Sequence, residues 1–314
     1  MNRVHPFKMS ALVCLILFFA AFSAVAGQLV TTDHQKWAGQ VVQQEKELAA
    51  LTKPNSIAVL YFRNTSDDRT LDPLQKGLTV MLISDLAKLD MVTVVERAEI
   101  QALVEELGFG QSGLVDPTSA PRVGRLLQSQ YLIGGSLAGN AATEVTAGAR
   151  LIDVAPGKLI GSATAKKKME QIFDLEKKLL NQIVTDLQLN LTQKQKEDLG
   201  KPLSRDQNAL MDLFRGIDAA DHQQYEEAAQ FLDRAIQRDP QLTLAKTSLQ
   251  EISKRISAKN SRRILRSIRS NVSFTTELEP ATPVARIPFP ASVQPTRPEQ
   301  RDPTFDDTSD NSDQ

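Results

Sequence analysis

Hydrophobic residues change their spacing several times along the chain, and each change predicts a different element. A continuous apolar run at 57–62 predicts a strand that is buried on both faces of its sheet. Helical spacing over 71–89 predicts an amphipathic helix, and Pro73 fits its first turn. The same patterns recur as far as residue 189. The expected strands are 57–62, 91–95, 131–137, 145–154 and 159–165, and the expected helices are 71–89, 98–107, 120–128 and 172–189.

The order of these elements predicts the fold class. They follow one another as β-α-β-α-α-β-β-β-α, which we interpret as one α/β domain with a mixed sheet over residues 53–192. Short turns join the last three strands, which are expected to form an antiparallel meander. Gly77 is expected to let the first helix of the domain pack closely on the sheet. A further amphipathic helix, Asp33 to Leu51, is expected in the preceding segment 27–52.

Residues 204–258 show a second helical pattern. The segments 209–216 and 225–240 resemble a single tetratricopeptide repeat, in which small residues bring two antiparallel helices together. Gly216 is expected to allow this close contact, and a third helix is expected over 242–256. A single repeat cannot bury a continuous core, so the hairpin is expected to dock on the α/β domain or on another chain. A plain helical hairpin is the alternative interpretation.

The N-terminal composition is typical of a secretory signal peptide over residues 1–26. An apolar run at 11–22 precedes the small-residue sequence 24–26, which predicts a mature chain that begins at Gly27 in the periplasm. An uncleaved membrane anchor is the alternative, but the run is shorter than the ~20 residues that span a bilayer. The single cysteine, Cys14, lies in this segment, so no disulfide is expected in the mature protein.

The C-terminal composition changes twice. Arginines alternate with isoleucine and leucine over 259–279, which predicts a basic amphipathic helix. Such a helix would either lie on an anionic membrane surface or expose a solvated face. Proline-rich and then aspartate-rich sequence is typical of a disordered tail over 280–314.

The composition and motifs give no indication of catalysis. The 37 Lys and Arg residues balance 38 Asp and Glu residues, which is not typical of a nucleic-acid-binding protein. The histidines lack a second His or Cys at ligand spacing. The glycine-rich loop 108–117 lies between helices and lacks a phosphate-binding motif. Asp67, Asp68 and Asp72 could bind a cation or cap the next helix. We therefore predict no catalytic residue, no cofactor and no metal.

Four motifs occur in a fixed order along the α/β domain. They are Ile57-Ala58-Val59-Leu60-Tyr61-Phe62-Arg63-Asn64, Val94-Val95-Glu96-Arg97, Gln111-Ser112-Gly113-Leu114-Val115-Asp116-Pro117 and Tyr131-Leu132-Ile133-Gly134-Gly135. This set resembles the CsgG family of curli production assembly and transport components and its holdfast-anchoring relative HfaB, over about 53–190. A weaker likeness runs to the TolB amino-terminal domain and to lipoprotein activators of penicillin-binding proteins. The resemblance implies a protein without an active site that works by assembly at the outer membrane.

The sequence departs from the family's curli channel, which is a lipidated ring that crosses the membrane with two β-hairpins per subunit. Cys14 lacks a lipoprotein acceptor sequence, and the meander over 131–165 has short turns without inserted segments. The leading hypothesis is therefore a periplasmic or outer-membrane-associated accessory protein of assembly or secretion. The alternatives are a subunit of an outer-membrane secretion channel for curli-like or holdfast material, and a regulator of a peptidoglycan synthase.

Two surfaces are predicted to contact partners. The first is the loop 109–116, with Phe109, Leu114 and Asp116, and the second is the helical hairpin, with Tyr225 and Phe231. Envelope proteins, further copies of this chain and the outer-membrane surface are the expected partners, and no nucleic acid is expected.

Overall fold

The strand predicted from the apolar run lies inside a five-stranded sheet in the computed structural model, which describes residues 28–48, 52–109 and 118–256. This strand, β1 (Lys53–Asn64), buries every residue from 56 to 62. The predicted signal peptide, the basic helix and the tail lie outside the described residues, as does most of the loop 109–116.

The sheet is mixed and has the strand order β2-β1-β3-β4-β5. β1 runs parallel to both of its neighbours. Ile57 of β1 pairs with Val94 of β2 on one side and with Tyr131 of β3 on the other. β3, β4 and β5 are antiparallel to one another, so the predicted meander is present. The remaining strands are β2 (Thr93–Val94), β3 (Ser129–Gly139), β4 (Val145–Asp153) and β5 (Lys158–Lys167).

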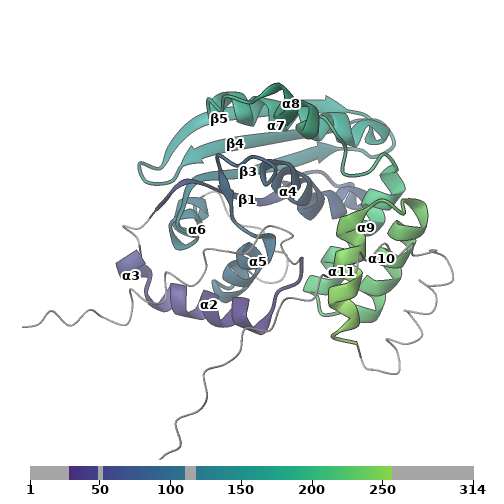
Figure 1. Cartoon of the computed structure of the whole chain (residues 1–314), viewed down its shortest axis with the longest axis horizontal. Helices are drawn as coiled ribbons and strands as arrows, with labels where there is room; N and C mark the ends of the chain where they lie inside the picture. Colours follow the sequence, from purple (N-terminus) through teal and green to yellow (C-terminus); the bar gives the residue numbers. More distant parts are fainter. Residues whose placement is uncertain (1–27, 49–51, 110–117, 257–314) are drawn as a thin grey trace, which may run out of the picture. The chain divides into compact units, whose positions relative to one another are not determined.

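Helices cover both faces of the sheet (Figure 1). α4 packs on β1 and α7 packs on β4 and β5, and these two helices contact each other. α5 contacts β1, α6 contacts β3, and α2 packs on α5. β2 and β3 lie on opposite sides of β1, so crossovers of the usual right hand place their helices on opposite faces. The bounds are α2 (Thr32–Gln43), α4 (Pro73–Leu86), α5 (Arg97–Glu106), α6 (Ala120–Leu126) and α7 (Ile172–Asp186).

This order of elements confirms the predicted α/β fold class.

The helices begin at residues that suit a first turn. Pro73 opens α4 as expected, and Thr31 caps α2 through a reciprocal pair of hydrogen bonds with His34. No helix in the described part of the chain combines the length and apolar character that crossing a membrane requires. The shorter elements are α3 (Glu45–Leu48), α8 (Gln193–Leu199) and the 3-10 helices η2 (Arg69–Leu71) and η3 (Met169–Gln171).

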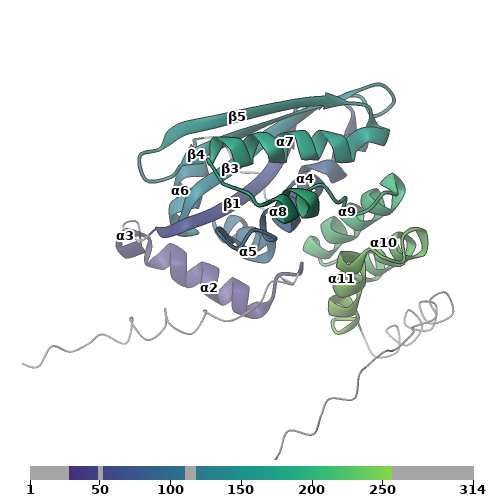
Figure 2. The same ribbon diagram turned by 45° about the horizontal axis from the view of Figure 1, so that its top comes forward.

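Three further helices form what we call the helical region: α9 (Gln207–Asp221), α10 (Tyr225–Arg238) and α11 (Thr243–Ser253). α10 packs against both α9 and α11. A Cβ atom added at Gly216 would lie 2.7 Å from Leu232 Cγ, so this glycine allows the close contact that its position predicts. α9 packs on α4, and the helical region therefore docks on the α/β domain (Figure 2).

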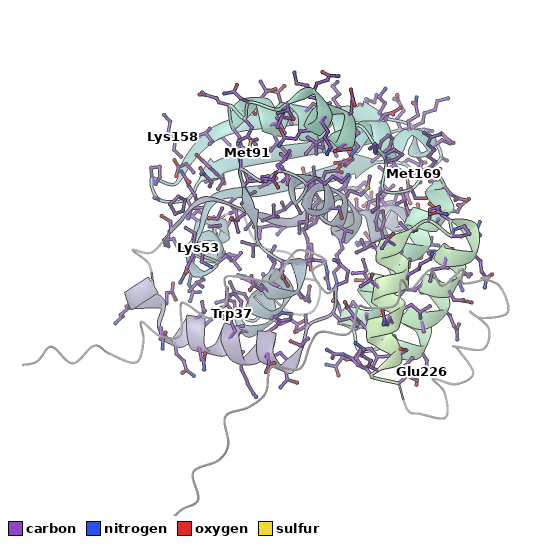
Figure 3. The ribbon with its side chains drawn as sticks, viewed as in Figure 1. Trp37, Lys53, Met91, Lys158, Met169 and Glu226 are labelled. Carbon is purple, nitrogen blue, oxygen red and sulfur yellow. The ribbon has the colours of Figure 1, made fainter. Side chains whose placement is uncertain are left out.

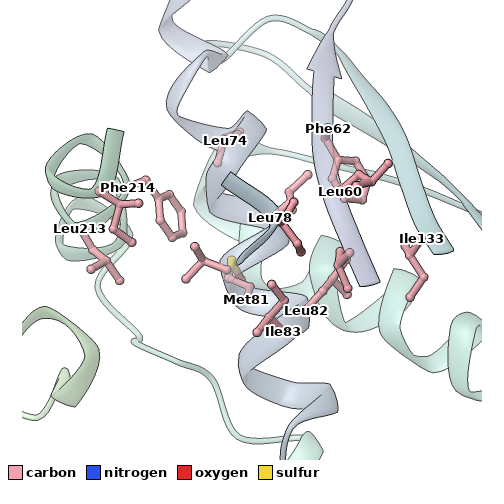
Figure 4. Packing of buried hydrophobic residues seen from close by; sticks show 14 of the residues in the cluster. Leu60, Phe62, Leu74, Leu78, Met81, Leu82, Ile83, Ile133, Leu213 and Phe214 are labelled. Atoms are coloured by element: carbon pink, nitrogen blue, oxygen red, sulfur yellow. The ribbon is translucent and has the colours of Figure 1, made fainter. Parts of the chain in front are cut away.

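Gly77 does not have the neighbour that we expected from the sequence. A Cβ atom at this position would lie 2.3 Å from Cδ2 of Phe214, which belongs to α9 rather than to the sheet. Figure 4 shows the Phe214 ring beside α4, on the side away from Leu60 and Phe62 of β1. The glycine in α4 therefore makes room for the helical region.

We expect substitution of Gly77 to weaken this docking. Gly77→Ala places a methyl group against the buried Phe214 ring, and overpacking of this kind costs about 1–3 kcal/mol of unfolding free energy. Gly39→Ala in α2 is the matched control, because its nearest neighbour would be Glu106 Oε1 at 3.8 Å. Replacing glycine by alanine inside a helix at such a site stabilises by about 0.5–1 kcal/mol. Chemical denaturation measures both changes, and a stabilised Gly77→Ala protein would contradict the packing described here.

Glu176 of α7 is an acidic side chain that is completely buried against α4. Burial and the neighbouring Asp85 carboxylate raise the pKa of Glu176 to about 8, although Lys177 opposes them. Lys177 also forms an ion pair with Asp85, and Lys88 holds the same carboxylate at 2.6 Å. The folded protein therefore keeps Glu176 protonated at a pH at which the unfolded chain has released that proton.

This difference in pKa predicts how stability varies with pH. The folded state binds one more proton than the unfolded state between pH 4.5 and pH 8, so the contribution of Glu176 is favourable at low pH and is lost as the pH rises. Glu176→Gln should stabilise the protein at pH 8, on the order of 4 kcal/mol, with the gain vanishing toward pH 4.5. Denaturation at several pH values tests this, with the exposed Glu170→Gln as control. A pH-independent difference between Glu176→Gln and the wild type would refute it.

Candidate interaction site at the junction with the helical region

Arg97 is the largest completely buried side chain in the described part of the chain. It begins α5, after the short parallel strand β2 and the N-cap residue Glu96. Its Nη1 donates to the hydroxyl of Tyr61 in β1 at 2.7 Å. The motif Glu96-Arg97 thus places a guanidinium beside the inner strand of the sheet, where it needs acceptors because a buried charge without a partner is costly.

The acceptor comes from the helical region. Asp221, the last residue of α9, receives two hydrogen bonds from Arg97, at 2.8 Å from Nη1 and 2.9 Å from Nη2. Lys76 of α4 donates to the same carboxylate at 2.7 Å and also contacts Asp218 at 2.9 Å. We call Tyr61, Lys76, Arg97 and Asp221 the junction, because these four side chains join β1, α4, α5 and α9.

The electrostatics of the junction follow from its burial. Desolvation alone would lower the pKa of Arg97, but Asp221 and Tyr61 outweigh it and raise that pKa. Burial raises the pKa of the Tyr61 hydroxyl, so it stays a neutral hydrogen-bonding group. Asp221 is 1% exposed and Lys76 is 5% exposed at their side chains. The junction is therefore a structural ion-pair cluster that fixes the helical region.

The structure places three of the five predicted contact residues. Phe109 is half-buried against the core after α5. Tyr225 is half-buried at the start of α10, and its hydroxyl accepts a hydrogen bond from Arg255 at 3.3 Å. Phe231 lies on α10 with the Arg234 guanidinium 4.4 Å from its ring centre. Leu114 and Asp116 lie outside the described residues. Phe109 follows α5, whereas Tyr225 and Phe231 lie on α10.

A further surface, which the sequence analysis missed, is the outer edge of β5. Leu159 and Ile160 are 54% and 37% exposed. Leu151 pairs with Gly161 and Ile152 with Leu159, so Ile160 forms a bulge opposite β4. Lys158, at the start of β5, lies at this outer edge of the sheet (Figure 3). Within the described residues β5 pairs with β4 alone, and an edge of this kind can bind an additional strand.

The polar loop after β1 is occupied by its own hydrogen bonds. Asp68 accepts from Thr70 and from the backbone N–H of Ala141, and these bonds lower its pKa. Asp72 accepts from Asn64 at 2.8 Å. The described residues contain no group of three or more histidine, aspartate or glutamate side chains placed to hold a metal ion. The loop carboxylates thus stabilise the turn into α4.

Comparison with known proteins gives a family match for one part of the chain. The model of a family described as curli production assembly/transport component CsgG matches residues 38–143, from α2 to the turn after β3. Residues 38–143 are thus similar to the CsgG family. The predicted family resemblance is confirmed for this CsgG-family region, which contains β1 and Arg97. The match does not include β4, β5, α7 or the helical region.

Individual proteins are more distantly similar. A protein of Rhizobium meliloti (strain 1021) named "Putative adenylate cyclase 3" is 27% identical over 197 residues, which are 62% of this chain and 32% of that protein. The chain thus spans about a third of the length of that relative, whose name describes the relative and not this chain.

Two solved structures match a part of the chain at low identity. The LpoB C-terminal domain from Salmonella enterica is 20% identical, covers 43% of this chain and 98% of that domain, and has a TM-score of 0.32. A lipoprotein from Neisseria meningitidis is 21% identical, covers 44% of this chain and 100% of that chain, and has a TM-score of 0.30. At these values the likeness carries no argument about function.

We expect removal of the Asp221 charge to destabilise the protein strongly. Asp221→Asn leaves the buried Arg97 and Lys76 side chains without their shared carboxylate, and breaking a buried ion pair on one side costs about 3–5 kcal/mol. Asp218→Asn is the control, because this carboxylate contacts the same Lys76 but is 46% exposed, and an exposed pair contributes about 1 kcal/mol or less. Chemical denaturation gives both values, and similar losses would show that the junction is not the buried constraint described here.

Proposed function

We propose that this protein is an accessory factor of envelope assembly or secretion that acts by binding other proteins and has no catalytic step. The match of residues 38–143 to the CsgG family carries this proposal. The predicted signal peptide agrees with it, because export would bring the mature chain into the periplasm. The helical region then serves as an adaptor that is fixed to the CsgG-family region.

The first candidate contact surface is α10. The Arg234 guanidinium covers the Phe231 ring and is also held by Asp212, 3.5 Å away. Arg238 contacts the other oxygen of Asp212 at 3.2 Å. Aromatic and arginine side chains are enriched at protein interfaces, and the anchoring to Asp212 reduces the conformational entropy that binding would cost. This surface retains the predicted role of Phe231.

The second candidate contact surface is the edge of β5 around Leu159 and Ile160. These apolar side chains are adjacent and exposed, and they accompany a strand whose outer edge pairs with no other described strand. A partner in an extended conformation could add to this edge through main-chain hydrogen bonds. The loop 109–116 remains a predicted surface from the sequence.

Site-specific photo-crosslinking in the envelope of the producing bacterium tests the proposal. We expect a benzoylphenylalanine at position 159 or 231 to form adducts with other envelope proteins. The same group at position 196, an exposed site on α8, is the matched control and should form few adducts. Adducts at none of the three positions, or equal adducts at all three, would contradict a role based on these surfaces.

Two further measurements separate the proposed role from the alternatives. Single-channel conductance of the purified mature protein in a planar bilayer would identify a channel subunit and would contradict an accessory role. A change in the turnover of a purified peptidoglycan synthase would narrow the role to regulation of that enzyme. The accessory role proposed here predicts no conductance.

A further inference from the structure

Residues 28–30, immediately before α2, are bound by side chains from distant parts of the chain. Gln28 and Leu29 are each 5% exposed, although they lie in irregular backbone before the N-cap of α2. Glu251 and Arg255, which contact this segment, lie in or directly after α11. Three parts of the chain that are distant in sequence therefore meet at residues 28–30.

Side chains hold this segment through its main chain. The Glu251 carboxylate accepts from the backbone N–H groups of Gln28 at 3.1 Å and of Leu29 at 3.3 Å. Arg97 Nη2 donates to the carbonyl oxygen of Gln28, and Arg255 Nη2 donates to that of Val30 at 2.5 Å. We call Arg97, Glu251 and Arg255 the clamp. It binds two donors and two acceptors of a backbone that bends at Gln28 and Leu29.

The chemistry of the clamp defines what it can bind. A carboxylate flanked by two guanidinium groups satisfies main-chain N–H and C=O groups whatever side chains they carry. Leu29 adds an apolar anchor, because its side chain belongs to the hydrophobic core. The clamp thus suits a short, bent peptide segment with an aliphatic residue between two residues whose main chain is bound.

The clamp also depends on the helical region. Arg97 reaches the segment from α5 and is oriented by Asp221 of α9, whereas Glu251 and Arg255 come from the end of α11. Arg255 further contacts the Tyr225 ring, with its guanidinium 5.8 Å from the ring centre. A peptide in the clamp therefore bridges the α/β domain and α11, and it strengthens the docking of the helical region.

We propose that Arg97, Glu251 and Arg255 form a binding site for a short, bent peptide segment, and that residues 28–30 are its resident ligand. This segment is a latch: it closes the helical region on the α/β domain while it is bound, and it leaves the site open to another peptide of this shape when it is displaced. The proposal does not depend on the function proposed above.

The experiment uses the full mature chain with the substitution Leu29→Asp, which removes the apolar anchor and dislodges the latch. The probe is an amidated, fluorescent peptide with the sequence of residues 27–32, Gly-Gln-Leu-Val-Thr-Thr. We expect the Leu29→Asp protein to bind this probe at least tenfold more tightly than the wild-type mature protein, whose clamp is occupied. Fluorescence anisotropy measures both affinities.

Two modifications test recognition of the main chain. Methylation of the leucine amide nitrogen in the probe removes the N–H group that donates a hydrogen bond to Glu251. This change should weaken binding at least tenfold. Adding Glu251→Gln to the Leu29→Asp protein should also weaken binding, whereas Glu227→Gln on the exposed face of α10 should not. Equal binding of the methylated and unmethylated probes, or no binding by a folded Leu29→Asp protein, would overturn the proposal.

A second measurement applies if Leu29→Asp fails to fold. Glu251→Gln in the otherwise wild-type mature chain should accelerate hydrogen exchange of the Gln28 and Leu29 amides at least tenfold, with no change in β1. Unchanged protection of these two amides would show that Glu251 does not hold the latch, and the proposal would be wrong.

Discussion

The bidentate pairing of Arg97 with Asp221 is the interaction on which the rest of the structure depends. One guanidinium binds Tyr61 in the sheet, Asp221 in the helical region and the main chain of Gln28. A buried ion pair of this kind contributes less to net stability than its short distances suggest, because both charges lose their hydration. It strongly disfavours arrangements that leave either charge unpaired, so it fixes how the helical region docks on the α/β domain.

The fold class could be predicted because the chain alternates strand-like and helix-like hydrophobic patterns, and the order of elements is the one observed. The hydrophobic pattern does not predict contacts between residues that are far apart in the sequence. Gly77 was expected to face the sheet, but it contacts Phe214, which lies far along the chain. β2 is only two residues long, although its apolar run is longer. The polar helix α8 carries no apolar periodicity, so its hydrophobic pattern does not predict it.

The candidate site was harder to predict than the fold. Phe231 was chosen from its place in the helical hairpin, and it does lie on α10 beside Arg234. The edge of β5 was missed because the bulge at Ile160 depends on the pairing register, which a single sequence does not reveal. Arg97 was visible only as part of a family motif. Its partner Asp221 could not be assigned, because nothing in the sequence links the end of α9 to the start of α5.

The central claim is that the helical region and the CsgG-family region form one cooperative unit. Native-state hydrogen exchange, followed by mass spectrometry at increasing denaturant, tests this most directly. The account predicts that the slowest amides of α9 and α10 exchange with the same opening free energy as those of β1 and β3, because opening the junction exposes unpaired buried charges. Exchange of α9–α11 at an opening free energy several kcal/mol lower than that of β1, with the sheet still protected, would contradict the account.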